Sequence, residues 1–320
     1  MPRLTVLLFV PLLLSCALAH AADWPQRPVR FVVPAPAGSS LDLVARVLSE
    51  RLAPLWGQPV VVDNRPGAGG LIGVEAAARA NGDGHVLALG FNGPLAYAPF
   101  LHPQVPYDVQ RDLAPVAITT RQPNALVVHN ALAVRTVSEL AAWARRAERV
   151  SFASVGAGTA SHLAMVLFAR QAGFTAVHIP FAGSPPAALS VARGETQLLF
   201  AVASGVLPQA RAGQLRLLAV TSPRRFPGLE ELPTLAEAGY PAVVSEAWNG
   251  LVANAATPPA LVTRINADVN RVLQTPSIAA RLRELGMAPG SGSPAAFRRL
   301  IDEEMKRWGP VIRDAGITVE

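Results

Sequence analysis

The chain has 320 residues, 51% of them apolar, and a formal net charge of +6. Its basic residues are nearly all arginine and lie in short runs without interleaved aromatic residues, a pattern that excludes typical nucleic-acid binding. A chain of this length forms either one large domain or two lobes with separate cores, and the order of its elements favours two lobes.

The N-terminus has the three parts of a secretory signal peptide. Arg3 is followed by an apolar run over residues 4–14 and by an Ala-His-Ala cleavage motif at 19–21. We therefore predict a signal peptide over residues 1–21 and a mature protein in the periplasm. Cys16 is the single cysteine and leaves with that segment, so we expect neither disulfides nor cysteine metal sites. Lipid attachment at Cys16 stays open as an alternative.

The first part of the mature chain repeats the order strand, loop, helix. Apolar runs of strand length lie at 29–33, 59–62 and 86–90. Apolar residues at helical spacing predict a helix over 41–55, and Ser39 with Asp42 forms a capping box at its start. Because helical crossovers join parallel strands, these elements predict a first α/β lobe.

The same order recurs after an extended stretch. Two extended runs at 114–118 and 124–128 predict a crossing into a second lobe. Further runs of strand length lie at 150–155, 176–181, 197–202 and 215–220. A run over 247–252 predicts the return crossing, and no strand of comparable strength is expected after it. The remaining helices are expected to pack on the first lobe and lie at 260–273, 278–285 and 295–313.

These elements predict an α/β protein of two lobes, each a mostly parallel sheet flanked by helices. We place the first lobe at residues 22–122 plus 247–320 and the second at 123–246. Two crossings between the lobes would act as a hinge. A ligand is expected between the lobes, at the carboxyl ends of the strands, where open α/β sheets bind ligands.

Two glycine-rich loops, at 67–73 and 156–161, each lie between a strand-like run and a helix-like run. Glycine lets the backbone take φ > 0 and expose its amides, which is how a loop binds an anion at a helix start. Neither loop matches the dinucleotide fingerprint, and the acidic residue that a ribose requires is absent. We interpret the loops as two sides of one anion site, and tight turns alone are the alternative.

Several other side chains have both a structural and a functional interpretation. We expect His162 to cap or pack, Trp248 to pack at the hinge, and Asp42 to face the amides of its own helix. Arg65 either binds a ligand carboxylate or anchors its own loop, and Asn92 either donates to the ligand or forms a plain turn. The sequence has no H-E-x-x-H and no G-x-S-x-G motif, so we expect neither a metal site nor a hydrolase.

Short motifs along the whole mature chain carry a family resemblance. They lie at 24–25, 28–30, 38–42, 57–62, 64–73, 106–108, 161–163, 183–184, 218–222 and 233–239. In this order and spacing they resemble the periplasmic solute receptors of the tripartite tricarboxylate transporter type, often called Bug receptors. The resemblance implies a periplasmic-binding-protein clamshell, type II-like, that closes on a small organic anion and delivers it to the membrane permease subunits of the transporter.

The resemblance also implies where the ligand binds. One carboxylate would be held by the first-lobe loops at 38–40 and 67–70, and the other end of the ligand by second-lobe loops at 154–161 and 183–184. The expected ligand-binding residues are Gly38, Ser39, Ser40, Gly67, Ala68, Gly69, Gly70, Asn92, Ser154, Gly158, Thr159, Ala160, Ser161, Gly183 and Ser184. No cofactor and no metal is implied, and the protein is expected to be a monomer. Two alternatives remain, which are an orphan receptor that passes its ligand signal to a sensor system and a secreted hydrolase.

The chain departs from the family pattern near the expected pocket. It has Ala35 in place of an aromatic residue, Ser39 in place of a glycine, and Ala157 in place of an asparagine. Phe181-Ala182 replaces Tyr-Lys, and Ala201-Val202 replaces an acidic residue and an asparagine. Most of these changes remove a polar or bulky group. We therefore expect a larger or less polar ligand than citrate or aspartate, such as an aromatic or branched carboxylate.

Overall fold

The computed structural model describes residues 24–314 and 316–319. The predicted signal peptide and Cys16 lie outside the described residues. Within these ranges, no helix combines the length and the apolar character that a membrane crossing requires.

The first lobe is built on three parallel strands. Their bounds and those of the helices between them are β1 (Val29–Val33), α1 (Ser40–Trp56), β2 (Val60–Asn64), α2 (Leu71–Ala78) and β3 (Val86–Phe91). Strand β1 is central and pairs in parallel with β2 and β3. Helix α1 begins where Ser39 Oγ accepts from the Asp42 amide at 3.3 Å, and it ends at Gly57, whose φ is +68°. The predicted βαβ order of this lobe is confirmed.

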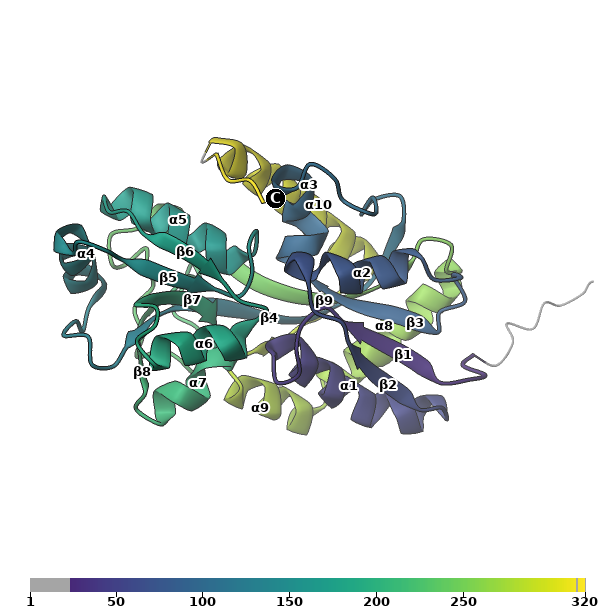
Figure 1. Cartoon of the computed structure of the whole chain (residues 1–320). Helices are drawn as coiled ribbons and strands as arrows, with labels where there is room; N and C mark the ends of the chain where they lie inside the picture. The colour runs from purple at the N-terminus through teal and green to yellow at the C-terminus, as the bar shows by residue number, and fades with distance from the viewer. Residues whose placement is uncertain (1–23, 315, 320) are drawn as a thin grey trace, which may run out of the picture.

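The two crossings are long strands that pair with each other. The expected runs 114–118 and 124–128 are parts of one strand of 17 residues, β4 (Leu113–His129). Its first half pairs antiparallel with β9 (Glu246–Asn254), and its second half pairs with two strands of the second lobe. As a result both lobes share one ten-stranded mixed sheet, and Figure 1 shows β4 and β9 running through both halves of the molecule.

The second lobe repeats the plan of the first. Its elements are α4 (Val137–Arg146), β5 (Ser151–Ser154), α5 (Ala160–Ala172), β6 (Val177–Pro180), α6 (Ser184–Ala192), β7 (Leu198–Val202), α7 (Ala203–Arg211) and β8 (Leu215–Val220). Strand β5 pairs in parallel with β6 and β7, while β7 and β8 each pair antiparallel with β4. The sheet is therefore parallel within each lobe and antiparallel at the crossings.

The C-terminal elements pack on the first lobe, as predicted. They are α8 (Pro259–Leu273), α9 (Pro276–Glu284), β10 (Ala288–Pro289) and α10 (Pro294–Asp314). Buried Ile265 and Val269 of α8 share a core with β1 and α1, and Phe297 of α10 packs against Trp248. Among the described residues, no strand of comparable strength follows β9, as predicted, since β10 pairs antiparallel with β4 over only two residues.

Shorter helical turns complete the first lobe. They are η1 (Ala68–Gly70), η2 (Gly93–Tyr97) and α3 (Ala98–Leu101), with η3 (Pro241–Val243) in the second lobe. One apolar cluster extends across both lobes, because Ala160 and Leu163 of α5 pack with Leu101 of α3. The lobes therefore touch at α5 as well as at the crossing strands.

Candidate functional site

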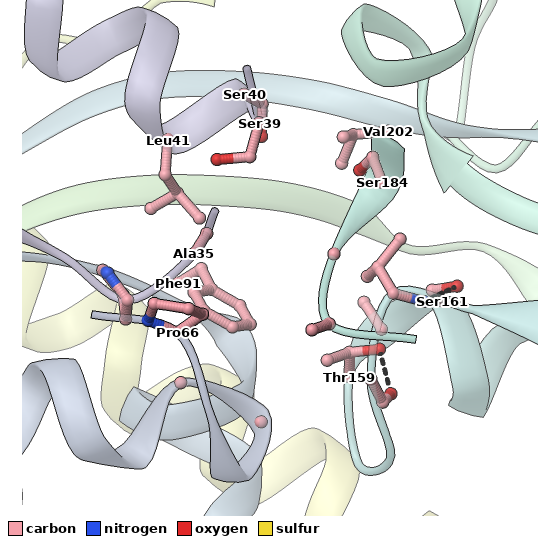
Figure 2. A pocket seen from close by; sticks show the side chains of 18 of the residues that line it. Ala35, Ser39, Ser40, Leu41, Pro66, Phe91, Thr159, Ser161, Ser184 and Val202 are labelled. Atoms are coloured by element: carbon pink, nitrogen blue, oxygen red, sulfur yellow. Dashed lines mark hydrogen bonds between the residues drawn. The ribbon is translucent and has the colours of Figure 1, made fainter. Parts of the chain in front are cut away.

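A cavity of about 260 Å³ lies between the two lobes. Its walls come from segments far apart in the sequence, which are 34–41, 66–70 and 91–92 of the first lobe and 155–161, 180–184 and Val202 of the second. The crossing strands add Asn124, Ala247 and Asn249. In Figure 2, Ala35, Leu41 and Phe91 face Val202, Ser184 and Thr159 across this space. The cavity is therefore where the strands were expected to place a ligand.

Five helices begin at the cavity. They are α1, α2, α5, α6 and α7, which follow β1, β2, β5, β6 and β7, so each starts beyond the carboxyl end of a strand that has a parallel neighbour. Their N-caps are Ser39, Gly70, Thr159, Gly183 and Val202, and all five line the cavity. The first amides of a helix lack partners within the helix, and the aligned peptide dipoles give this end a partial positive charge. The cavity is thus suited to a negatively charged group.

No charged side chain is present among the described residues that line the cavity. An anion there would meet main-chain amides, hydroxyl groups and asparagine side chains rather than arginine or lysine. The apolar part of the wall includes Leu41, Phe91, Phe181 and Val202. This combination favours an anionic group attached to an apolar body.

The two glycine loops meet across the mouth of the cavity. A Cβ added to Gly69 would lie 3.0 Å from the carbonyl oxygen of Ala157, and one added to Gly183 would lie 2.9 Å from Pro36. Both glycines have positive φ, +61° and +121°. Glycine therefore allows the backbone at Gly69 to approach the Ala157 backbone, and the backbone at Gly183 to approach the Pro36 ring.

Twelve of the fifteen residues predicted to bind ligand line the cavity, and Gly38, Ser154 and Gly158 do not. The Gly38 amide donates to Asp42 Oδ2 at 2.9 Å, and the Gly158 amide donates to His162 Nδ1 at 3.2 Å. Ser154 Oγ lies 2.7 Å from His178 Nε2 and accepts from the Gly156 amide. These three residues therefore hold the loops in shape, and their polar groups bond within the protein.

The polar side chains at the cavity wall are also partly bonded within the protein. Thr159 Oγ1 donates to the Gly156 carbonyl at 2.7 Å, and Ser161 Oγ donates to the Phe200 carbonyl. Asn92 Nδ2 donates to the Glu246 carbonyl at 3.3 Å and to Glu304 Oε2 at 2.8 Å. Because both hydrogens of that amide are used, Asn92 lines the cavity without a free side-chain donor.

The expectation that Asp42 faces the amides of its own helix is wrong, because the backbone amide that donates to its carboxylate is that of Gly38, which precedes the helix. Burial alone would raise the pKa of Asp42, but hydrogen bonds from Arg46 and from the Gly38 amide outweigh burial and lower it.

The structure also decides between the two interpretations of Arg65, which were binding of a ligand carboxylate and anchoring of its own loop. Its Nε donates to Asp63 Oδ2 at 2.8 Å and it does not line the cavity, so it anchors its own loop.

His162 and Trp248 pack within the protein, as predicted. The His162 ring stacks on His178 with centroids 3.9 Å apart and planes 11° apart. Burial lowers the pKa of His162 to about 4, with a smaller effect from the charge of His178, and burial lowers the pKa of His178 to about 4 as well. Both rings are therefore neutral at pH 7 and support the 156–158 loop from behind. Trp248 packs against Phe297 and does not line the cavity.

Sequence reasoning missed several residues of the cavity wall. Leu41 and Phe91 are each next in sequence to a predicted residue, and Asn124 and Asn249 lie on the crossing strands. The position of Phe91 at the carboxyl end of β3 was a usable signal, because ligands bind at that edge of a sheet. Of the residues where the chain departs from the Bug pattern, all but Ala201 line the cavity, and these are Ala35, Ser39, Ala157, Phe181, Ala182 and Val202.

Comparison with known proteins identifies the family. The model of the tripartite tricarboxylate transporter family receptor, TctC, matches residues 44–317. The chain belongs to the TctC family. TctC receptors are solute-binding proteins of the periplasm and not enzymes, which confirms the resemblance that the sequence motifs indicated and the prediction of a receptor.

Solved TctC-type structures share the fold of this receptor over nearly its whole length. R. palustris Rpa4515, solved with adipate, is 35% identical with a TM-score of 0.90, and the match covers 93% of this chain and 100% of that one. The periplasmic binding protein BugD is 30% identical with a TM-score of 0.87 and coverages of 92% and 100%. MatC from Rhodopseudomonas palustris, solved with malate, is 30% identical with a TM-score of 0.85 and coverages of 90% and 100%. These matches confirm the predicted two-lobe clamshell.

Proposed function

We propose that this TctC receptor captures a small organic carboxylate between its lobes in the periplasm and delivers it, as a monomer, to the membrane permease subunits of a tripartite transporter. The observation that carries the proposal is the convergence of five helix starts on a cavity whose described wall has no charged side chain. Two relatives of similar fold were solved with carboxylates, one with adipate and one with malate.

Helix ends supply the attraction in this proposal. A charge at a helix N-terminus is stabilised by about 0.3 to 1 kcal/mol at an exposed site and by up to about 2 kcal/mol where it is partly buried. Five such ends at the cavity, together with the glycine-loop amides, give a carboxylate several donors. Because the donors come from both lobes, the ligand contacts all of them in the closed form, and binding shifts the population toward closure.

The wall of the cavity supports a ligand that is larger or less polar than citrate or aspartate. Ala35 and Val202 occupy positions where the family pattern has bulkier or more polar residues, and both line the cavity. Leu41 and Phe91 add apolar surface on the first-lobe side. We therefore propose a carboxylate with an aromatic or branched apolar body.

Calorimetry on ligand-free protein tests both statements. The panel contains citrate, aspartate, and a set of aromatic and branched carboxylates, and mass spectrometry identifies any acid that copurifies with the native protein. We expect micromolar binding of at least one aromatic or branched acid. Micromolar binding of citrate or aspartate, with no binding of aromatic acids, would refute the proposed class of ligand. If no carboxylate of the panel binds, the proposed function as a carboxylate receptor is refuted.

A transport assay tests the delivery step. Membrane vesicles that contain the membrane subunits of a tripartite transporter from the same organism should take up the bound acid only when the receptor is added. If a neighbouring sensor kinase responds to the loaded receptor and no uptake occurs, the receptor serves signalling instead.

A further inference from the structure

Asn124 lies where β4 changes its pairing partner. The preceding residue, Pro123, still pairs with Glu246 of β9, whereas Asn124 pairs with Val202 of β7. Asn124 lines the cavity and is 1% exposed. It is therefore a buried polar residue at the hinge, beside the apolar side chain of Val202.

The main chain of Asn124 is fixed by hydrogen bonds. Its amide donates to Thr221 Oγ1 at 3.0 Å, and its carbonyl accepts from the Thr221 amide at 2.9 Å. Thr221 Oγ1 in turn donates to the Ser245 carbonyl at 2.7 Å. These bonds tie β4 to both neighbouring segments of the second lobe, so the position of the Asn124 side chain at the cavity is set by the sheet.

The side-chain nitrogen of Asn124 has no hydrogen-bond partner among the described residues. Several other buried side-chain polar atoms within residues 24–314 also lack a hydrogen-bond partner. Of the residues in 24–314 that carry such an atom, Asn124 is the one that lines the cavity. The other two asparagines of the wall differ, since Asn92 Nδ2 has two protein acceptors and Asn249 Nδ2 donates to Thr120 Oγ1 at 2.9 Å. A buried donor without a partner is unfavourable and requires an explanation.

We propose that Asn124 Nδ2 donates a hydrogen bond to an oxygen of the bound ligand, which rests on the proposed function of the cavity as a carboxylate site. The helix starts hold one carboxylate, the apolar wall contacts the body of the ligand, and Asn124 meets a second oxygen at the hinge. The substrate class is therefore an acid with a second acceptor oxygen at the far end of an apolar body. A hydroxyl and a second carboxylate share this chemistry.

Three aromatic acids that differ only at the para position test the proposal. Phenylacetate has no para oxygen, 4-hydroxyphenylacetate has a hydroxyl, and 4-carboxyphenylacetate has a carboxylate. Calorimetry measures their affinities for the wild type, for Asn124→Leu, and for Gln122→Leu, which changes a buried amide on the same strand that does not line the cavity. The acid that loses affinity shows whether the hydroxyl or the carboxylate meets Asn124.

We expect Asn124→Leu to weaken binding of at least one para-oxygen acid about tenfold, which corresponds to about 1.4 kcal/mol, and to leave phenylacetate within twofold. Gln122→Leu should leave the order of the three affinities unchanged. Asn124→Ala removes the donor without adding a charge, so it provides the same test if the leucine variant does not fold.

Three outcomes would overturn the proposal. The first is that both Asn124 variants bind all three acids as the wild type does. The second is that they lose affinity for phenylacetate as much as for the para-oxygen acids. The third is that the wild type binds none of the three. This last result leaves the proposed function intact if another carboxylate of the wider panel binds.

Discussion

Substitution of Gly69 by alanine should weaken ligand binding through a collision between the lobes. In the closed form, the new Cβ would lie 3.0 Å from the Ala157 carbonyl oxygen, which is closer than ordinary contact. Gly57 provides a matched control, because its φ of +68° is close to the +61° of Gly69 and its added Cβ would meet nothing within 4 Å. The two variants therefore share the backbone strain and differ in the contact across the cavity mouth.

The magnitude has two parts. Left-handed backbone costs a residue with a Cβ about 1 to 2 kcal/mol, so both variants should lose that amount of unfolding free energy in urea titrations without ligand. The contact with Ala157 adds an overpacking cost of about 1 to 3 kcal/mol in the closed form. Calorimetry should therefore give an affinity about 5- to 150-fold lower for Gly69→Ala and unchanged for Gly57→Ala. Equal affinities for the two variants would show that the glycine loops do not meet in the bound state.

Three further predictions concern the second-lobe loop and the cavity wall. Gly158→Val should weaken ligand binding, because the new Cβ would lie 2.8 Å from Leu101 Cδ1 of the other lobe. Adding Leu101→Ala should restore the affinity measured by calorimetry. If the double variant binds as weakly as Gly158→Val, a clash between the lobes is not the cause. Burial lowers the pKa of His162 to about 4, so between about pH 4 and 6.5 the unfolded chain binds more protons than the folded protein does. The free energy of unfolding therefore falls as the pH drops through that window. His162 alone should account for a loss of about 2 kcal/mol from pH 7 to pH 5. Urea titrations should show a smaller loss for His162→Leu, and an equal loss would contradict a buried neutral ring. Phe91→Ala should lower affinity for aromatic acids about tenfold and leave short-chain acids unchanged, and a uniform loss would argue against apolar contact.

The sequence predicted the elements well because their signals are local. Apolar runs and the Ser39 cap located β1 and α1, and the glycine-rich runs located two loops that line the cavity. The order of the elements was sufficient to infer two lobes with the cavity between them, since parallel strands place their carboxyl ends at one edge.

The sequence could not predict contacts that depend on residues far apart. The side-chain amide of Asn92 donates to Glu304, a residue 212 positions later in the chain. No local sequence pattern could therefore show that this amide already has a hydrogen-bond acceptor within the protein. The pairing of β4 with both β9 and β7 likewise depends on strands from two different lobes. Gly158 is a different case, because its amide donates to His162 only four residues later, and the glycine pattern carried no information about that bond.

The ten-stranded sheet that passes through both lobes has a consequence for how the receptor comes apart. Because β4 and β9 are bonded side by side and each contributes to the core of the molecule, neither half can melt without exposing strand edges of the other. Heating should therefore produce one sharp calorimetric transition rather than two. Opening of the lobes should bend the hydrogen-bonded strands β4 and β9, and it should not be a free rotation about a flexible linker.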